Sequence, residues 1–424
     1  MEYTFSPMTD SEKLEQAVQT LYGPAAAAAQ IQRYQRLFQG LTDTFGPSGQ
    51  AAVFSAPGRT ELGGNHTDHQ HGKVLTGSVN LDIIAAVVPN GEKVIRLQSE
   101  GFPMDIVELD DLEVHPEEYN QSVSILRGTA AWFARQGCAL EGFNAYTTST
   151  VFKGSGLSSS AALEVLLGNI FNSLFNDGKC TPVQLAQIGQ YAENVYFGKP
   201  SGLLDQMGSS VGGMVTIDFQ DNDHPAVEKI SFDFASAGHA LCIIDSGADH
   251  ADLTGEYAAV PQELKEVCGY FGKSVLREVP EADFFAALPE LRQKAGDRAV
   301  LRAIHVYEEN QRVLGQAAAL KRGDFESFLQ LVKSSGLSSW RLLQNVVPAG
   351  YTRHQEVALA LALCERLLEG RGACRVHGGG FAGTIQAFVP LDMLERFRTE
   401  MEKVLGAGSC HVLSIRPAGG VRLV

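Results

Sequence analysis

Residues 153–165 read KGSGLSSSAALEV, and this stretch decides how the rest of the chain is interpreted. Its glycines permit a tight loop whose backbone can approach a ligand closely, and its serines lead into a run of helix-forming residues. The start of such a helix directs N–H groups and a positive dipole toward one place, which is typical of a phosphate-binding loop. An ordinary glycine–serine turn with a helix N-cap is the alternative. The candidate phosphate-binding residues are Gly154, Ser155, Gly156, Leu157, Ser158, Ser159 and Ser160.

The composition limits the classes of protein to which this chain can belong. A chain of 424 residues is longer than a single domain with one hydrophobic core usually is. We therefore predict two domains, at residues 1–235 and 236–424. Hydrophobic residues make up 44% and charged residues 20%, as in a globular protein. A net charge of −15 argues against binding nucleic acid. It does not argue against a nucleotide, which local N–H groups, a lysine and Mg²⁺ can hold.

The sequence shows no sign of secretion or membrane insertion. The apolar run Leu81–Val88 is too short to span a bilayer, and the first residues lack the pattern of a signal peptide. Seven cysteines include no CxxC pair, which favours reduced thiols over a zinc site or a disulfide framework. We predict a cytoplasmic protein.

Hydrophobic periodicity predicts the regular elements. Helices are expected twice within 11–45, then at 122–136, 161–175, 182–196, 299–320, 325–331 and 356–368. Strands are expected at 51–56, 74–88, 93–98, 143–150, 214–219 and 239–245, and a glycine-rich turn opens into a strand within 374–389. The dipeptide Asn90-Gly91 predicts a tight hairpin turn between the strands 74–88 and 93–98.

Residues 57–72, PGRTELGGNHTDHQHG, combine four glycines with charged side chains and predict a binding loop after the strand 51–56. Three histidines and an aspartate, His66, Asp68, His69 and His71, lie within six residues. Few of them can converge on one metal ion at that spacing, so we favour hydrogen bonding to a polar ligand.

Asp205 lies in a second glycine-rich stretch, 198–213, GKPSGLLDQMGSSVGG. A bare carboxylate is costly in such an apolar setting unless it is paired. One interpretation is a helix-capping aspartate. The other is a general base held ionised by a cation, which Arg59 of the earlier loop could supply.

Other phosphoryl-transfer motifs do not fit. Gly272-Lys273-Ser274 would need a glycine at 267 to form a Walker A loop, and valine stands there. The sequence has neither the His-Arg-Asp nor the Asp-Phe-Gly motif of protein kinases. The stretch after Gly154-Ser155-Gly156 does not complete a dinucleotide fingerprint.

In combination these motifs resemble those of the GHMP kinases and, within them, the galactokinases. The family's sugar signature, PGRxNLIGEHTDYN, is matched by Pro57-Gly58-Arg59, Leu62, Gly64 and His66-Thr67-Asp68. Residues 156–161, 202–206 and 378–383 are similar to the family's phosphate loop, base segment and third motif. The resemblance covers about 50 to 390 and is specific.

The resemblance implies an activity, a fold and a set of roles. The activity is ATP-dependent phosphorylation of the anomeric hydroxyl of galactose, with Mg²⁺ as cofactor and no obligatory protein partner. The fold is a two-domain α+β GHMP kinase fold, with a ribosomal S5 domain 2-like N-terminal lobe and a ferredoxin-like C-terminal lobe. Asp205 corresponds to the catalytic base, Arg59 to the cation beside it, and Ser160 and Glu193 to the magnesium ligands. The implied sugar-binding residues are Asn65, His66, Asp68, Gly202 and Tyr257.

The chain also departs from the family pattern. Asn65 stands where the family has glutamate, and Glu61 stands where it has asparagine. In the family that glutamate contacts the C6 hydroxyl of the sugar, whereas an asparagine could hydrogen-bond a hydroxyl and would not repel a carboxylate there. The exact sugar therefore stays open, with galacturonate, arabinose and N-acetylgalactosamine as alternatives to galactose. The stretch 333–339 also lacks the family's histidine. A sugar sensor without turnover is a further alternative, which Ser160-Ala161 disfavours because inducers of that type lack the pair.

Overall fold

The computed structural model describes residues 9–151, 156–248 and 253–424. Within these residues the larger sheet has eight strands: β1 (Ala52–Gly63), β2 (Lys73–Pro89), β3 (Val94–Ser99), β4 (Asp105–Glu108), β5 (Phe143–Ser149), β6 (Met214–Asp218), β7 (Ala226–Ile230) and β12 (Val421–Arg422). Their order is β12-β1-β2-β5-β3-β4, with β6 pairing β2 and β7 pairing β6. The smaller sheet has the order β11-β8-β10-β9, from β8 (His239–Asp245), β9 (Ala373–Val376), β10 (Thr384–Pro390) and β11 (Cys410–Leu413).

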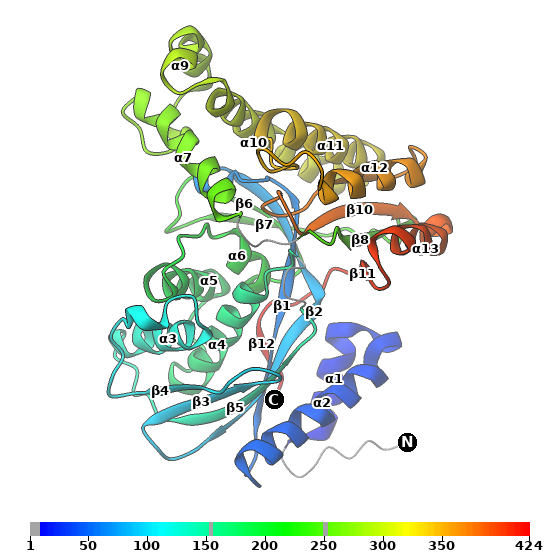
Figure 1. Ribbon diagram of the computed structural model, residues 1–424. Coiled ribbons are helices and arrows are strands. Elements are labelled where there is room, and N and C mark those ends of the chain that lie inside the picture. Colours follow the sequence, from blue (N-terminus) through cyan, green and yellow to red (C-terminus); the bar gives the residue numbers. More distant parts are fainter. Residues whose placement is uncertain (1–8, 152–155, 249–252) are drawn as a thin grey trace.

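Helices surround both sheets (Figure 1). Those in the first half are α1 (Ser11–Tyr22), α2 (Pro24–Phe45), α3 (Ser122–Arg135), α4 (Ser159–Phe175), α5 (Pro182–Tyr191) and α6 (Leu204–Ser210). Those in the second half are α7 (Thr254–Tyr270), α8 (Glu281–Ala286), α9 (Leu288–Lys294), α10 (Asp297–Lys321), α11 (Phe325–Ser338), α12 (Glu356–Leu368) and α13 (Leu394–Leu405). Two π-helical turns, Ala192–Phe197 and Ser339–Leu343, extend α5 and α11.

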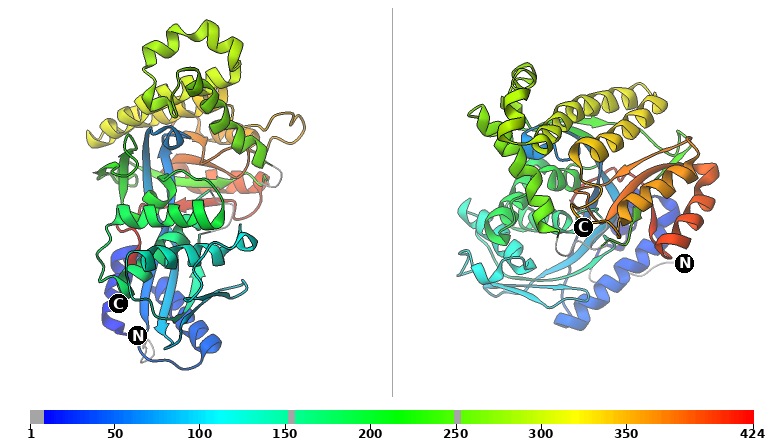
Figure 2. Two further views of the ribbon diagram at one scale, coloured as in Figure 1. Left: turned by 90° about the vertical axis from the view of Figure 1, so that its left-hand side faces the viewer. Right: turned by 45° about the horizontal axis from the view of Figure 1, so that its top comes forward.

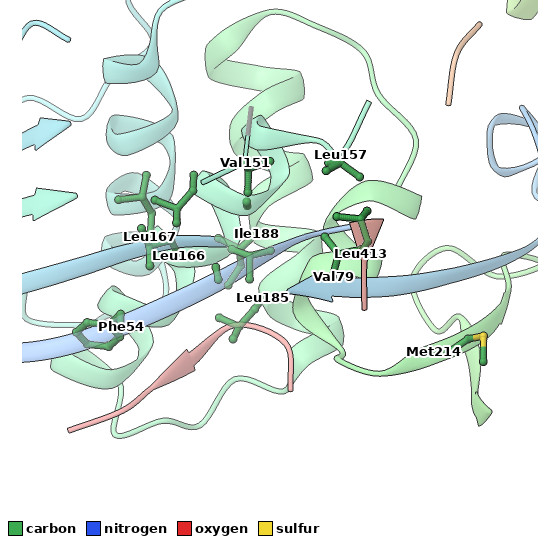
Figure 3. Packing of buried hydrophobic residues seen from close by; sticks show 14 of the residues in the cluster. Phe54, Val79, Val151, Leu157, Leu166, Leu167, Leu185, Ile188, Met214 and Leu413 are labelled. Atoms are coloured by element: carbon green, nitrogen blue, oxygen red, sulfur yellow. The ribbon is translucent and has the colours of Figure 1, made fainter. Parts of the chain in front are cut away.

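The central strand β2 is covered on both faces near its end, which explains the unbroken apolar run at residues 83–88. Ile84 and Ala86 belong to a core formed with α1 and α2, whereas Ala85 and Val87 belong to a core formed with α3 and α4. The alternation follows the two-residue period of a strand. Figure 3 shows residues of the second core from several elements, among them Phe54 of β1 and Leu166 of α4.

The smaller sheet uses the same alternation. Leu241 and Ile243 of β8 join the core that also contains Phe54 of β1, while Cys242 and Ile244 face a separate core built with α12 and α13. The core of the larger sheet therefore continues into the smaller one. Figure 2 shows the yellow-green segment with α8 and α9 at one end of the molecule. Among the described residues, no helix combines the length and the apolar character that crossing a bilayer requires.

The sheets change between β7 and β8, on either side of residue 235. The end of the chain returns to the larger sheet, because Val421 of β12 pairs with Ser55 of β1. We therefore keep the division near residue 235 as a proposal in which the last residues of the chain belong with the N-terminal lobe.

Two predictions of local structure are wrong. Residues 57–63, expected to be loop, continue strand β1, with a register shift between Pro57 and Arg59 that accommodates the proline and glycine. The strands on either side of Asn90-Gly91 do not form a hairpin, because β5 lies between them and pairs with both β2 and β3. Most other predicted helices and strands are confirmed to within a few residues.

Candidate functional site

Arg59 and Asp205, which are 146 residues apart, form an ion pair between β1 and the first turn of α6. Arg59 Nε and Nη2 lie 2.7 Å and 2.6 Å from Asp205 Oδ1. Ser158 Oγ donates to the other carboxylate oxygen, Oδ2, across 2.8 Å. The pairing that the sequence suggested for these two residues is present, and the serine contact is an addition that the sequence analysis did not foresee.

Electrostatics keep Asp205 ionised. Burial acts to raise the pKa of its carboxyl, but the Arg59 charge and the hydrogen bonds from Ser158 and Arg59 outweigh it, so that the pKa lies below its ordinary value. The side chain of Asp205 is 38% exposed, whereas that of Arg59 is 8% exposed. Solutes can thus reach the ionised carboxylate, whereas the cation that holds it is buried.

The backbone of β1 brings the serine-rich stretch to this pair. Arg59 N donates to the Leu157 carbonyl across 2.9 Å, and Arg59 Nη1 donates to the Gly156 carbonyl. A Cβ at Gly58 would lie 2.9 Å from the Leu157 carbonyl, so a glycine is required for this close approach. The Leu157 side chain is fully buried in the core, and it anchors the turn there (Figure 3).

The candidate phosphate-binding residues lie at the start of α4, as far as the structure describes them. Gly154 and Ser155 lie outside the described residues. Ser158 is the N-cap position of α4, with φ of 57°, and Ser159 and Ser160 begin the helix. Ser160 is exposed there. The 17-residue helix α4 thus has its positive end beside Asp205, through Ser158.

Glu193 is held in a chain of buried polar groups next to this pair. Its Oε1 accepts from Lys199 Nζ at 3.0 Å, and its Oε2 accepts from Gln206 Nε2 at 3.0 Å. The same Gln206 nitrogen donates to Glu164 Oε2 at 2.8 Å. Burial and the neighbouring Glu193 raise the pKa of the Glu164 carboxyl well above its ordinary value.

Glu164, Gln206 and Lys199 are further residues that the sequence analysis did not single out. Glu164 interrupts the apolar run 161–167 on α4, and a fully buried carboxylate in such a run is a signal that could have found it. Gln206 directly follows Asp205. Only the folded chain shows that its amide bridges two carboxylates.

The candidate sugar-binding side chains gather around the turn 378–380 and the start of α6. His66 Nε2 lies 3.0 Å from the Gly379 carbonyl oxygen, and the Tyr257 hydroxyl donates to the Gly380 carbonyl across 2.7 Å. Any side chain at Gly202 would collide with the carboxylate of Asp68, which shows how closely these two residues approach. Burial lowers the pKa of His66 to about 4, so its ring is neutral at pH 7.

Asn65 is placed differently from its neighbours in the motif, because it is fully buried. Its Nδ2 donates to the Gly378 carbonyl across 2.6 Å and lies 3.2 Å from Glu61 Oε1, while its Oδ1 accepts from Asn345 Nδ2 at 2.8 Å. Glu61 in turn forms a buried ion pair with Arg375 of β9. The Asn65 amide is thus fully engaged with protein groups in this structure.

The donor set fits a magnesium ion that is also bound by a nucleotide. Magnesium prefers oxygen ligands and commonly takes one or two from protein and the rest from phosphate and water. Glu193 supplies a carboxylate, the Ser160 hydroxyl is exposed, and Glu164 Oε1 is a buried oxygen without a hydrogen-bond partner. In the described part of the chain, no three His, Cys, Asp or Glu side chains are arranged to hold a metal by themselves.

Comparison with known proteins identifies relatives over most of the chain. The model described as the galactokinase galactose-binding signature matches residues 41–89, and the GHMP kinases N terminal domain matches residues 124–213. The galactokinase of Streptomyces coelicolor is 32% identical over 374 residues, which cover 87% of this chain and 93% of that protein. The galactokinase of Glaesserella parasuis is 32% identical over 365 residues, covering 84% of this chain and 89% of that protein.

Solved structures show the same fold. The structure of Lactococcus lactis galactokinase complexed with galactose has a TM-score of 0.78 at 24% identity and covers 92% of this chain and 100% of that chain. A mevalonate kinase has a TM-score of 0.60 at 14% identity and covers 86% of this chain and 99% of that chain. The predicted two-lobed α+β fold is confirmed by these matches.

Proposed function

The chain belongs to the galactokinase family of the GHMP kinases, and we propose that it transfers the γ-phosphoryl group of ATP to the anomeric hydroxyl of galactose. The products are galactose 1-phosphate and ADP. The observation that carries the proposal is the contact of Arg59 and Ser158 with the two oxygens of Asp205. That contact gives an ionised carboxylate at the start of a helix suited to bind phosphate.

The reaction needs a base because a neutral hydroxyl is a weak nucleophile. As the anomeric oxygen attacks the γ-phosphorus, its proton passes to Asp205. The new bond joins that oxygen to phosphorus, the bond from the γ-phosphorus to the bridging oxygen breaks, and its electron pair leaves with ADP. Arg59 keeps Asp205 ionised and fixes its orientation through two donors on one oxygen.

Ser160 and Glu193 would hold the magnesium ion, which offsets the negative charge of the phosphates when it is bound. Gly156 and the serines 158–160 stand at the positive end of α4, where backbone N–H groups suit phosphate oxygens. Gly154 and Ser155 complete that loop in the proposal. Both cofactor roles follow from the family, with the buried carboxylate of Glu193 as the supporting observation.

Asp68, His66, Gly202 and Tyr257 would surround the sugar. Their contacts with one another and with the turn 378–380 support this role. Asn65 holds the turn 378–380 by its hydrogen bond to the Gly378 carbonyl. In the proposal it acts on the sugar through that turn. All seven cysteines, which lie in the described residues, are free thiols, in keeping with a reducing compartment, and we propose a cytoplasmic location.

A coupled assay of ADP release with ATP, Mg²⁺ and a sugar panel tests the activity. We expect galactose to give the highest kcat/KM, ahead of galacturonate, arabinose and N-acetylgalactosamine. Tight sugar binding without ADP release for any of them would instead support a sensor. A higher kcat/KM for galacturonate than for galactose would assign the enzyme to a uronic acid.

A further inference from the structure

Lys199 lies beside the proposed magnesium ligand and has no part in the mechanism above. Its Nζ is 3.0 Å from Glu193 Oε1, and the two side chains differ sharply in exposure, at 58% for Lys199 and 4% for Glu193. The glutamate is thus enclosed within the protein, whereas more than half of the lysine side chain lies at the surface.

The backbone holds Lys199 in this position. The π-helical turn Ala192–Phe197 ends at Gly198, whose φ of 81° is readily adopted by glycine. Lys199 N then donates to the Glu193 carbonyl across 3.2 Å, so the chain folds back over the glutamate that it pairs with.

Three carboxylates act on the Lys199 ammonium. Glu193 contacts the ammonium group directly, and the nearby Asp205 and Glu164 also favour its charged form. In return the Lys199 charge helps to lower the pKa of Asp205. Lys199 is therefore a full cation at pH 7, close enough to the proposed base to influence its charge.

We propose that Lys199 binds the γ-phosphoryl group of the nucleotide during its transfer, and that its ion pair with Glu193 is the arrangement it keeps before the nucleotide binds. The inference rests on the proposed function, because Glu193 is a magnesium ligand only in that scheme. If Glu193 bound magnesium, the metal would neutralise its charge in place of Lys199. The Lys199 ammonium could then bind phosphate oxygens. Lysine commonly serves as a point charge for phosphate, and the site beside Asp205 is where the phosphoryl group meets the hydroxyl.

The test compares nucleotides that differ only at the γ-position. Calorimetry would measure the Kd of the non-hydrolysable analogue AMP-PNP and of ADP, each with Mg²⁺, for the wild type, Lys199→Met and Lys199→Arg. For Lys199→Met we expect about tenfold weaker binding of AMP-PNP and unchanged binding of ADP, since a charged hydrogen bond is lost only with the γ-phosphate. The kcat should fall by about 10²-fold at an unchanged KM for galactose, and Lys199→Arg should restore part of both losses.

Lys179→Met is the matched control, because Lys179 also pairs with an acid at 3.0 Å, with a side chain that is 70% exposed. It should change none of these quantities. Equal effects of Lys199→Met on AMP-PNP and ADP, or no effect on either, would overturn the proposal, and thermal unfolding of each variant would expose a merely structural loss. A wild type that releases no ADP with galactose refutes the proposed function itself, whereas an active wild type with a normal Lys199→Met variant refutes only the role of Lys199.

Discussion

Replacing Ser158 by alanine removes the hydroxyl that donates to Asp205 Oδ2 across 2.8 Å. A hydrogen bond to a charged group contributes about 1.5–3 kcal/mol, and one pKa unit corresponds to about 1.4 kcal/mol. Because the Asp205 side chain is 38% exposed, solvent screens this energy to about 1.4 kcal/mol, and its loss should raise the pKa of Asp205. The base works when ionised and is lost as pH falls through its pKa. The acidic limb of kcat/KM should therefore move to higher pH by about one unit.

The pH profile of Ser158→Ala separates this role from phosphate binding. If the hydroxyl served the nucleotide instead, KM for ATP would rise and the acidic limb would stay in place. Ser159→Ala is the control, since Ser159 lies next in the same helical turn. An acidic limb of kcat/KM for galactose that does not move in Ser158→Ala, with ATP saturating, would refute the electrostatic reasoning for Asp205.

Three other changes test the proposed base, the proposed magnesium ligand and a buried ion-pair network around Asp82. Asp205→Asn should lower kcat by about 10²-fold or more while galactose still binds, as measured by single-turnover assays and calorimetry. Glu193→Gln should raise the Mg²⁺ concentration for half-maximal activity by about tenfold or more, as a magnesium titration would show. Asp82→Asn leaves the buried Arg33 and Arg416 without their shared carboxylate and should lower the free energy of unfolding by about 3–5 kcal/mol in urea. Burial opposes ionisation of Asp82, but the two arginines lower its pKa, so the wild type should lose this stabilisation only below pH about 4.

Local sequence patterns predicted most of the regular elements because hydrophobic periodicity was strong. Strand β8 and helix α12 begin and end at the residues expected. Helix α7 escaped prediction because Pro261 lies inside it and interrupts the pattern that marks a helix. Strand β1 was cut short at Pro57 for the same kind of reason, although a register shift lets the strand continue.

Which strands pair in a sheet and which side chains meet in the site depend on the tertiary structure. Local sequence patterns therefore could not predict them. Gly91 has a φ of 71°, which fits the turn expected at Asn90-Gly91. The turn does not determine which strand pairs with β3. The hydrogen bond from Ser158 to Asp205 likewise joins residues 47 positions apart. The charges of the two glycine-rich stretches suggested Arg59 as one possible cation for Asp205, and the resemblance to one family singled out this pair.

The exchange of Glu61 and Asn65 relative to the family pattern has a physical explanation in the fold. The two side chains contact one another, with Asn65 Nδ2 lying 3.2 Å from Glu61 Oε1, so the exchange keeps an acid and an amide in one contact. It moves the charge to position 61, where Arg375 of the smaller sheet neutralises it inside the protein. The neutral Asn65 then hydrogen-bonds to Gly378 of the turn 378–380 and to Asn345. It thereby connects both to the N-terminal lobe. Asn65, which the sequence marked as a sugar contact, thus bonds to the turn that His66 and Tyr257 contact, and we propose that it acts on the sugar only through that turn.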